Sequence, residues 1–269
     1  MGRIYAIANQ KGGVGKTTTA VNLGAFLAAF DQHILLVDLD PQANATSCLG
    51  IDKISVKNST YDVLIGAVPA LKNILFNQKL KISLLPSSPS LAGAEVELVP
   101  VISRETRLRE ALKPLIERYD YILIDCPPSL GLLTLNGVVA AKDGVIIPVQ
   151  CEYLALEGIG QLNQTLSRIR SAIFPELRVR GVVLTMFDIR TKLSADVVHE
   201  INQHFPEQVF KTIIPRSVRL AEAPSYGQPI SVYAPGSNGA MAYSNLAREI
   251  LIGDGVLTTQ PIQHLVSAE

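Results

Sequence analysis

Residues 10–18 form a short glycine-rich segment whose residue types fit a site that binds phosphate. The segment reads QKGGVGKTT and lies between an apolar run and a stretch with helical spacing. Glycines allow successive backbone N–H groups to converge on one anion, and the N-terminus of the following helix adds partial positive charge. In such a loop Lys16 would reach the β- and γ-phosphates of a nucleotide, while the Thr17 hydroxyl would ligate Mg²⁺.

The loop departs from the general phosphate-loop pattern G-x-x-x-x-G-K-[ST] at its first position, where Gln10 stands in place of glycine. The motif present is K-G-G-x-G-K-T, with an additional lysine at the front. A glycine-rich turn with a chance lysine is the alternative, but the flanking strand and helix patterns favour the phosphate site. The residues expected to contact the nucleotide are Lys11, Gly12, Gly13, Val14, Gly15, Lys16, Thr17 and Thr18.

Aspartates stand at the ends of two further apolar runs. Asp38 and Asp40 follow residues 35–37, and Asp125 follows residues 121–124. In open α/β sheets, ligands bind beyond the carboxyl ends of the strands. An aspartate placed there can hold Mg²⁺, usually through water, or orient a water that attacks the γ-phosphate. A turn or a helix cap is the common role of a single such aspartate. Two such sites in a chain with this loop favour a magnesium–nucleotide site.

The elements that must position these residues follow from an alternation of two patterns. Short, almost continuous apolar runs suit parallel strands covered on both faces, and the longer segments between them have helical spacing. We expect strands over 4–8, 34–37, 82–85, 121–124, 144–149, 179–184 and 209–214, and helices over 16–30, 104–119, 132–141, 158–173, 194–205 and 239–251. The alternation predicts a single doubly wound α/β domain, with a mostly parallel sheet and helices on both faces.

Length and composition fit one folded domain. The chain has 269 residues, of which 48% are hydrophobic, so a mainly disordered chain is excluded. We expect one domain over residues 1–252 and a loose tail over residues 253–269. No run reaches the roughly 18 to 20 apolar residues of a membrane helix, and the first residues lack the features of a signal peptide. The three cysteines form no CxxC pair, so we expect a cytoplasmic protein with no membrane partner.

Taken together, the sequence resembles the ParA/MinD group of deviant Walker P-loop ATPases, and within it the partition proteins of the ParA and Soj type. The resemblance covers residues 3 to about 252 and rests on six motifs in order. They are KGGVGKTT in the loop, VDLDPQANAT at 37–46, IDCPPSLG at 124–131, PVQCEYLALEG at 148–158, LTMFDIRTKLS at 184–194 and IIPRSVRLAEAPSYGQPI at 213–230.

The resemblance implies an ATP hydrolase that uses ATP and Mg²⁺. By analogy, Lys16 and Thr17 would hold phosphate and metal, and Asp125 would hold the metal through water. Asp40 would position the hydrolytic water, while Asp38 would be a structural residue or part of the magnesium shell. The order of these last two roles stays open.

Lys11 takes on a specific meaning within this family. The resemblance implies that it crosses an ATP-bound sandwich dimer to the partner's nucleotide, which would couple hydrolysis to dimerisation. A solvated loop lysine is the alternative. We therefore expect an ATP-dependent homodimer with Lys11 among the catalytic residues.

Adenine recognition in the family falls in late segments of the chain. A thioether and a proline ring offer an apolar slot for a flat base, and nearby backbone groups can recognise its edge. Here the matching residues are Met186, Pro215, Arg216 and Ser217. Ser217 stands where relatives commonly have asparagine, so a side-chain hydrogen bond to adenine is not implied there. Ordinary core packing is the alternative for Met186.

The net charge of zero conceals an uneven distribution along the chain. Lys and Arg number 24, as do Asp and Glu, but residues 165–220 hold nine basic and five acidic side chains. The resemblance implies that basic residues here bind double-stranded DNA without sequence preference. The candidates are Arg190, Arg219, Lys192 and Lys211, with ordinary surface charge as the alternative for each. Because DNA affinity grows with the number of phosphates contacted, we expect the dimer to be the DNA-binding form.

The implied function is DNA segregation, with a ParB-type centromere-binding partner that stimulates hydrolysis and with association to the nucleoid. A MinD-like membrane-cycling regulator is the alternative, but it needs a basic amphipathic C-terminal helix, and the last 17 residues contain no Lys or Arg. A metal-cluster carrier would need a CxxC pair or cysteines placed to bridge a dimer, and Cys126 beside Asp125 has no such motif with it. Amidoligase relatives of the same fold remain open, although the motif at 213–230 favours partition.

Overall fold

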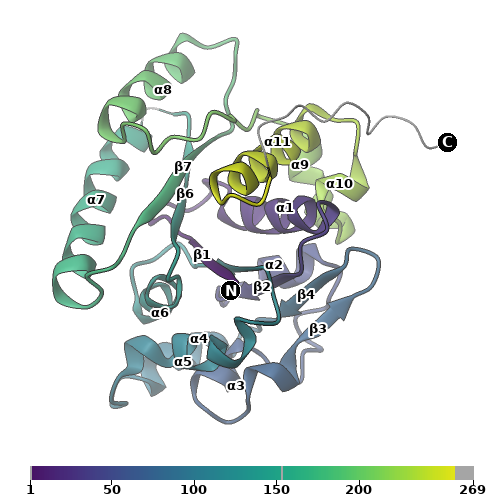
Figure 1. The fold of residues 1–269 in the computed structure, drawn as a ribbon, viewed down its shortest axis with the longest axis vertical. Coiled ribbons are helices and arrows are strands. Elements are labelled where there is room, and N and C mark those ends of the chain that lie inside the picture. The colour runs from purple at the N-terminus through teal and green to yellow at the C-terminus, as the bar shows by residue number, and fades with distance from the viewer. Residues whose placement is uncertain (1, 153, 258–269) are drawn as a thin grey trace.

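The computed structural model describes residues 2–152 and 154–257, which form one seven-stranded sheet with helices on both faces (Figure 1). The strand order is β3-β4-β2-β5-β1-β6-β7, with β3 antiparallel to β4 and the other neighbours parallel. The strands are β1 (Arg3–Ile7), β2 (Ile34–Asp38), β3 (Leu75–Asn77), β4 (Ile82–Leu85), β5 (Tyr121–Asp125), β6 (Gly144–Gln150) and β7 (Val179–Thr185). The predicted doubly wound α/β fold is confirmed.

Two apolar layers enclose the sheet, one on each face. One contains alternate strand residues such as Ile4 and Ala6, packed by α3 to α8, and the other contains Tyr5 and Ile7, packed by α1, α2 and α9 to α11. The helices are α1 (Lys16–Ala29), α2 (Asn44–Cys48), α3 (Thr60–Leu64), α4 (Leu91–Glu97), α5 (Arg107–Leu112), α6 (Leu132–Ala140), α7 (Leu154–Ala172), α8 (Lys192–His204), α9 (Val218–Glu222), α10 (Ile230–Tyr233) and α11 (Asn238–Gly253). Strands buried on both faces explain the continuous apolar runs.

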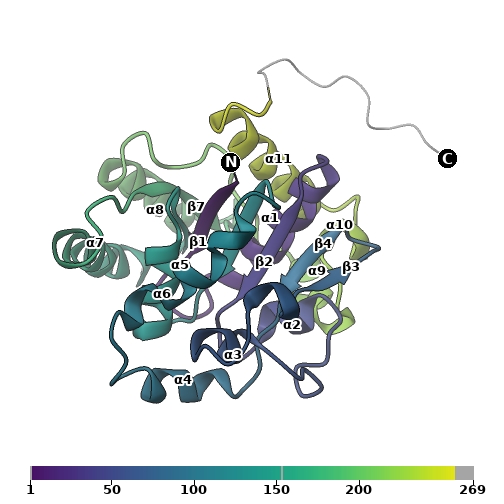
Figure 2. The same ribbon diagram turned by 60° about the horizontal axis from the view of Figure 1, so that its bottom comes forward.

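The sheet order brings the chemical residues together. β1 and β2 both pair with the central strand β5, and the register sets Ile7 and Asp38 on either side of Asp125. The glycine-rich loop leaves β1 at this same edge and enters α1. Strands far apart in sequence therefore end side by side. Figures 1 and 2 show α7 and α8 beyond the β7 edge of the sheet, on the side away from β3.

Two expected elements differ from the sequence-based prediction. Residues 209–214 do not form a regular strand, because the carboxylate of Glu249 accepts the backbone N–H groups of Lys211 and Thr212 at 2.6 and 3.0 Å. Single bridges, such as Val209 with Val182, hold this segment beside β7 instead. The helix expected over 104–119 is broken into shorter pieces, with Pro114 in the 3₁₀ turn Lys113–Leu115, since proline cannot donate the backbone bond that an α-helix needs.

The chain from Gly253 to Leu257 packs against the domain, although these residues fall within the segment expected to be a loose tail. Just after α11, the Asp254 carboxylate accepts the Tyr5 and Tyr121 hydroxyls at 2.9 and 3.0 Å and pairs with Arg180 at 3.0 Å. The remainder of that segment, residues 258–269, lies outside the described residues, so the tail stays a prediction there. Within the described ranges, no helix is long and apolar enough to cross a bilayer.

Candidate functional site

The glycine-rich loop is fixed by hydrogen bonds at both of its ends. At the front, the Asn9 side chain donates to the carbonyl of Pro148 at 2.7 Å and accepts the backbone N–H of Lys11 at 3.0 Å. At the back, the Thr185 hydroxyl donates to the carbonyl of Val14 at 2.9 Å. Gly15, which caps α1, has φ of 87°, a left-handed conformation that glycine adopts without strain. The loop backbone is therefore preformed at the N-terminus of α1.

Lys16 is a buried cation at the start of this helix. Its side chain is enclosed, with 7% of the residue exposed, and its ammonium donates to the Lys11 carbonyl at 3.0 Å. Burial lowers the pKa of the Lys16 ammonium, while the charges of Asp125 and Asp40 oppose that shift. An ammonium has three donors, and a buried one is costly unless acceptors surround it. A phosphate at the loop would supply the missing acceptors.

Asp125 lies at the end of β5 with both carboxylate oxygens buried and without a hydrogen-bond partner among the described residues. Burial raises the pKa of the Asp125 carboxyl well above its ordinary value, and the charge of Asp38 raises it further. An unpaired buried carboxylate is rare because it loses its hydration without compensation. The Thr17 hydroxyl, in the first turn of α1, lies near enough to Asp125 to oppose this rise in pKa. Oxygen ligands that leave room for several waters suit Mg²⁺, so these residues fit that ion.

Asp38 has its carboxylate occupied by the chain around it. One oxygen accepts the backbone N–H and the hydroxyl of Thr46 at 2.8 and 2.7 Å, and the other accepts the Asp40 N–H at 3.2 Å. Burial raises the pKa of the Asp38 carboxyl to about 6. These bonds fix the turn between β2 and α2. The geometry therefore favours a structural role for Asp38 over a place in the magnesium shell.

Asp40 is held in the turn after β2, close to the loop. One carboxylate oxygen accepts the Gln42 N–H at 2.9 Å, and its backbone carbonyl accepts the Ser87 hydroxyl at 2.8 Å. On the outer side, the Lys53 ammonium donates to the Gln42 carbonyl at 2.9 Å. The turn that carries Asp40 is thus fastened on both sides.

Lys11, in contrast, is half-buried, and its ammonium forms no ion pair with any side chain that the structure describes.

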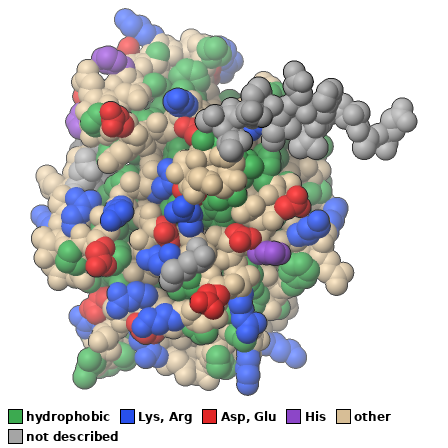
Figure 3. All heavy atoms as spheres, in the orientation of Figure 1, with side chains coloured by type: hydrophobic (Ala, Val, Ile, Leu, Met, Phe, Trp, Pro, Cys, Tyr) green, Lys and Arg blue, Asp and Glu red, His purple; other side chains and the backbone are tan. Residues whose placement is uncertain are grey.

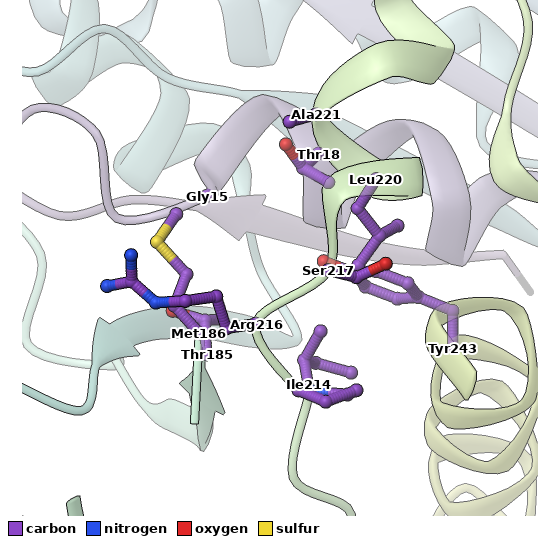
Figure 4. A pocket seen from close by; sticks show the side chains of 11 residues that line it. Gly15, Thr18, Thr185, Met186, Ile214, Arg216, Ser217, Leu220, Ala221 and Tyr243 are labelled. Carbon is purple, nitrogen blue, oxygen red and sulfur yellow. The ribbon is translucent and has the colours of Figure 1, made fainter. Parts of the chain in front are cut away.

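A cavity of about 290 Å³ lies beside the loop, and all the residues predicted to contact the base line it (Figure 4). They are Met186, Pro215, Arg216 and Ser217. Several other lining residues were not predicted from the sequence, namely Thr185, Ile214, Leu220, Ala221 and Tyr243. Tyr243 comes from α11 and bonds to the Thr19 hydroxyl of α1 at 3.1 Å. Met186 has φ of 53°, a strained conformation for a residue with a side chain, and such strain often marks a binding site.

The four predicted DNA contacts are exposed but do not form a single cluster. Arg190 and Lys192 lie at the start of α8, and Arg219 lies in α9. Lys211 lines a different hollow beside α11, with Arg248 and Glu249. Arg190 and Arg219 both pair with carboxylates of their own protomer, at 2.6 and 3.1 Å. Figure 3 shows basic and acidic side chains interspersed over one face of the molecule.

Comparison with known proteins places these features in a family. A family model described as an AAA domain matches residues 2–179. The sporulation initiation inhibitor protein Soj of Bacillus subtilis is 53% identical over 93% of this chain and 98% of its own length. The chromosome partitioning protein ParA of Myxococcus xanthus is 50% identical over 94% of this chain and 89% of its own. A solved cobyrinic acid a,c-diamide synthase of Mycobacterium smegmatis, with bound ADP and magnesium, has a TM-score of 0.84 at 38% identity, covering 98% of this chain and 100% of that one.

Proposed function

The chain belongs to the ParA and Soj family of DNA segregation ATPases, and from this membership we propose that it binds ATP with Mg²⁺ at the site described above and acts as a dimer on DNA. One observation carries the proposal. A buried cation and a buried carboxylate that accepts no hydrogen bond from the described residues, Lys16 and Asp125, act on each other electrostatically beside a preformed phosphate loop. The neighbouring cavity is large enough for a flat base.

Each residue of the site then has a defined task. Lys16 and the backbone N–H groups from Gly12 to Thr18 bind the phosphates, and Met186 with the turn at 215–217 encloses the base. Thr17, and Asp125 through water, hold Mg²⁺, which neutralises charge that develops on the phosphates. Asp40 accepts a hydrogen bond from the attacking water and orients it toward the γ-phosphate. Asp38 positions Asp40 by accepting its backbone N–H.

DNA binding follows from dimerisation in this proposal. The four candidate residues of one protomer, Arg190, Lys192, Lys211 and Arg219, are exposed and could contact only a few phosphates. A protein that contacts so few phosphates binds DNA weakly at physiological salt. Two protomers joined by ATP would double the number of contacts on one duplex. We further propose that a ParB-type partner stimulates hydrolysis, and that the protein is cytoplasmic and associates with the nucleoid. The Soj and ParA relatives favour this function over the MinD-like alternative.

DNA binding should therefore depend on the nucleotide. We expect mobility-shift assays with a duplex of arbitrary sequence to show salt-sensitive binding with ATP and little binding with ADP. Arg219→Glu, which reverses a charge in α9 without touching the loop, should remove DNA binding while ATP-dependent dimers persist. Equal affinity with ATP and ADP would contradict the switch. Loss of dimers together with DNA binding would mean that Arg219 acts on the fold or the nucleotide instead.

Lys11 should matter only in the dimer. Since its side chain pairs with no carboxylate in the described part of its own protomer, Lys11→Ala should leave ATP binding to the monomer nearly intact. We expect the variant to lose ATP-dependent dimers in analytical ultracentrifugation and at least about 100-fold in turnover, as happens when a charge-stabilising donor is removed. Lys16→Ala is the matched comparison, because it should abolish ATP binding itself. Wild-type turnover in Lys11→Ala would exclude Lys11 from the active site.

A further inference from the structure

Three arginines in or near the base cavity are each paired with a carboxylate of the same protomer. Arg190 pairs with Asp188 at 2.6 Å and Arg216 pairs with Glu152 at 2.8 Å. These four side chains line one hollow of about 460 Å³, which adjoins the base cavity and shares Met186 and Arg216 with it. Further along, Arg219 pairs with Glu222 at 3.1 Å. The local charge of the hollow is therefore balanced, although the surrounding sequence region is basic.

Asp188 holds Arg190 unusually well for a pair at the surface. Its two oxygens accept the guanidinium through Nε at 2.8 Å and Nη2 at 2.6 Å, and one oxygen also accepts the Arg190 backbone N–H at 3.1 Å. The Asp188 side chain is mostly covered, with 18% exposed, whereas 81% of the Arg190 side chain faces solvent. Arg190 lowers the pKa of the Asp188 carboxyl, and Arg216 contributes to that shift, so the carboxylate stays charged at neutral pH. A bidentate pair of this kind is the strong form of an ion pair.

This geometry places two anions in competition for one guanidinium. Arg190 has two edges that can bind a phosphate in bidentate fashion, and the one formed by Nε and Nη2 is taken by Asp188. A phosphate that approaches the remaining donors also meets the negative charge of the carboxylate. We propose that Asp188 competes with DNA phosphate for Arg190, and that the intact pair keeps the DNA affinity of the ATP-bound dimer low. This inference rests on the proposed DNA binding, and it adds a residue that limits that binding.

The test is the salt dependence of DNA binding by the full chain with saturating ATP and Mg²⁺. Asp188→Asn keeps the size of the side chain but removes its charge, so it should free Arg190 in both protomers. We expect the association constant for a duplex of arbitrary sequence to rise about 60-fold near 0.1 M salt, as two added phosphate contacts imply. The slope of log K against log salt should steepen by about 1.8, which corresponds to two additional phosphate contacts per dimer.

Three further variants test whether the gain in DNA affinity comes from the release of Arg190 or only from the loss of one negative charge. Asp196→Asn removes an exposed acid of α8 that forms no ion pair in the described part of the chain, so it should give a much smaller increase. In the double variant Asp188→Asn/Arg190→Ala the gain should disappear. Glu222→Gln should raise affinity through Arg219 in the same way. Dimerisation by ATP is measured for each variant, so that only dimers are compared.

The outcomes distinguish this inference from the proposed function. If the wild-type dimer binds DNA and Asp188→Asn binds no better, or binds less tightly, Asp188 does not compete and instead orients Arg190 for DNA. If the gain survives the loss of Arg190, the competition lies elsewhere. If the wild-type protein shows no DNA binding with ATP, the proposed function itself fails, whatever the variants do.

Discussion

Replacing Asp40 with alanine should lower ATP turnover by about 100-fold or more, because a residue that orients and deprotonates water typically contributes that much. The carboxylate stands beside Lys16 and Asp125 at the carboxyl edge of the sheet, and its turn is fastened by Ser87. Alanine removes the acceptor of the Gln42 N–H, but the Asp40 carbonyl still accepts the Ser87 hydroxyl and the Ala43 N–H, both at 2.8 Å. We therefore expect ATP to bind and dimers to accumulate, since hydrolysis would no longer separate them.

The measurement is phosphate release under saturating ATP, combined with the lifetime of DNA complexes after a chase with competitor duplex. Asp40→Ala should prolong that lifetime in proportion to the lost turnover. Asp52→Ala is the matched control, because Asp52 is an exposed aspartate twelve positions further on and outside the site. Unchanged turnover in Asp40→Ala would show that Asp40 has no role in hydrolysis. Loss of ATP binding would show that Asp40 is needed to bind the nucleotide.

Asp254→Ala should produce the largest loss of stability among the substitutions considered, about 3–5 kcal/mol in the free energy of unfolding. The Asp254 side chain is 3% exposed and accepts hydrogen bonds from the Tyr5 and Tyr121 hydroxyls. It also forms ion pairs with Arg180 and Arg3. Alanine would leave two buried hydroxyls and a largely buried guanidinium without their acceptor. Removal of one partner from a buried charged network costs far more than the network contributes in net terms.

Urea denaturation followed by circular dichroism measures this effect. Asp254→Asn keeps acceptor capacity but removes the charge, so it should fall between alanine and wild type. Asp196→Ala, at an exposed position of α8 where the side chain has no hydrogen bond or ion pair in the described part of the chain, should change stability by no more than about 0.5 kcal/mol. A loss below about 1 kcal/mol in Asp254→Ala would show that the chain after α11 contributes little to the domain.

Local sequence patterns predicted the parts of the molecule that depend on neighbouring residues. The loop, the apolar strands and the aspartates after them are short continuous segments, and the rule that ligands bind at strand ends brought Asp38, Asp40 and Asp125 to one edge. Resemblance to the family predicted four residues that contact the base, and all four line one cavity.

Features that depend on contacts between residues far apart in the chain could not be predicted from local sequence patterns. Tyr243 lies on a helix whose spacing indicates only a buried face, and its place in the base cavity results from packing on α1. Asp254 seemed part of a tail because its partners Tyr121 and Tyr5 are 133 and 249 positions away. The strand expected over 209–214 was displaced by a side chain, Glu249, that no local pattern connects to it.

Helix α11 takes part in both of these distant contacts, so one continuous element joins the base cavity to the far end of the sheet. Tyr243 lines the base cavity, and about 16 Å further along the same helix axis Asp254 is bonded to the opposite end of the sheet. A ligand whose binding shifts α11 would also act on the bonds of Asp254, and the docking of Asp254 would then change the affinity of the cavity by an equal free energy. In that case the loss of Asp254 would be measurable as a change in nucleotide affinity.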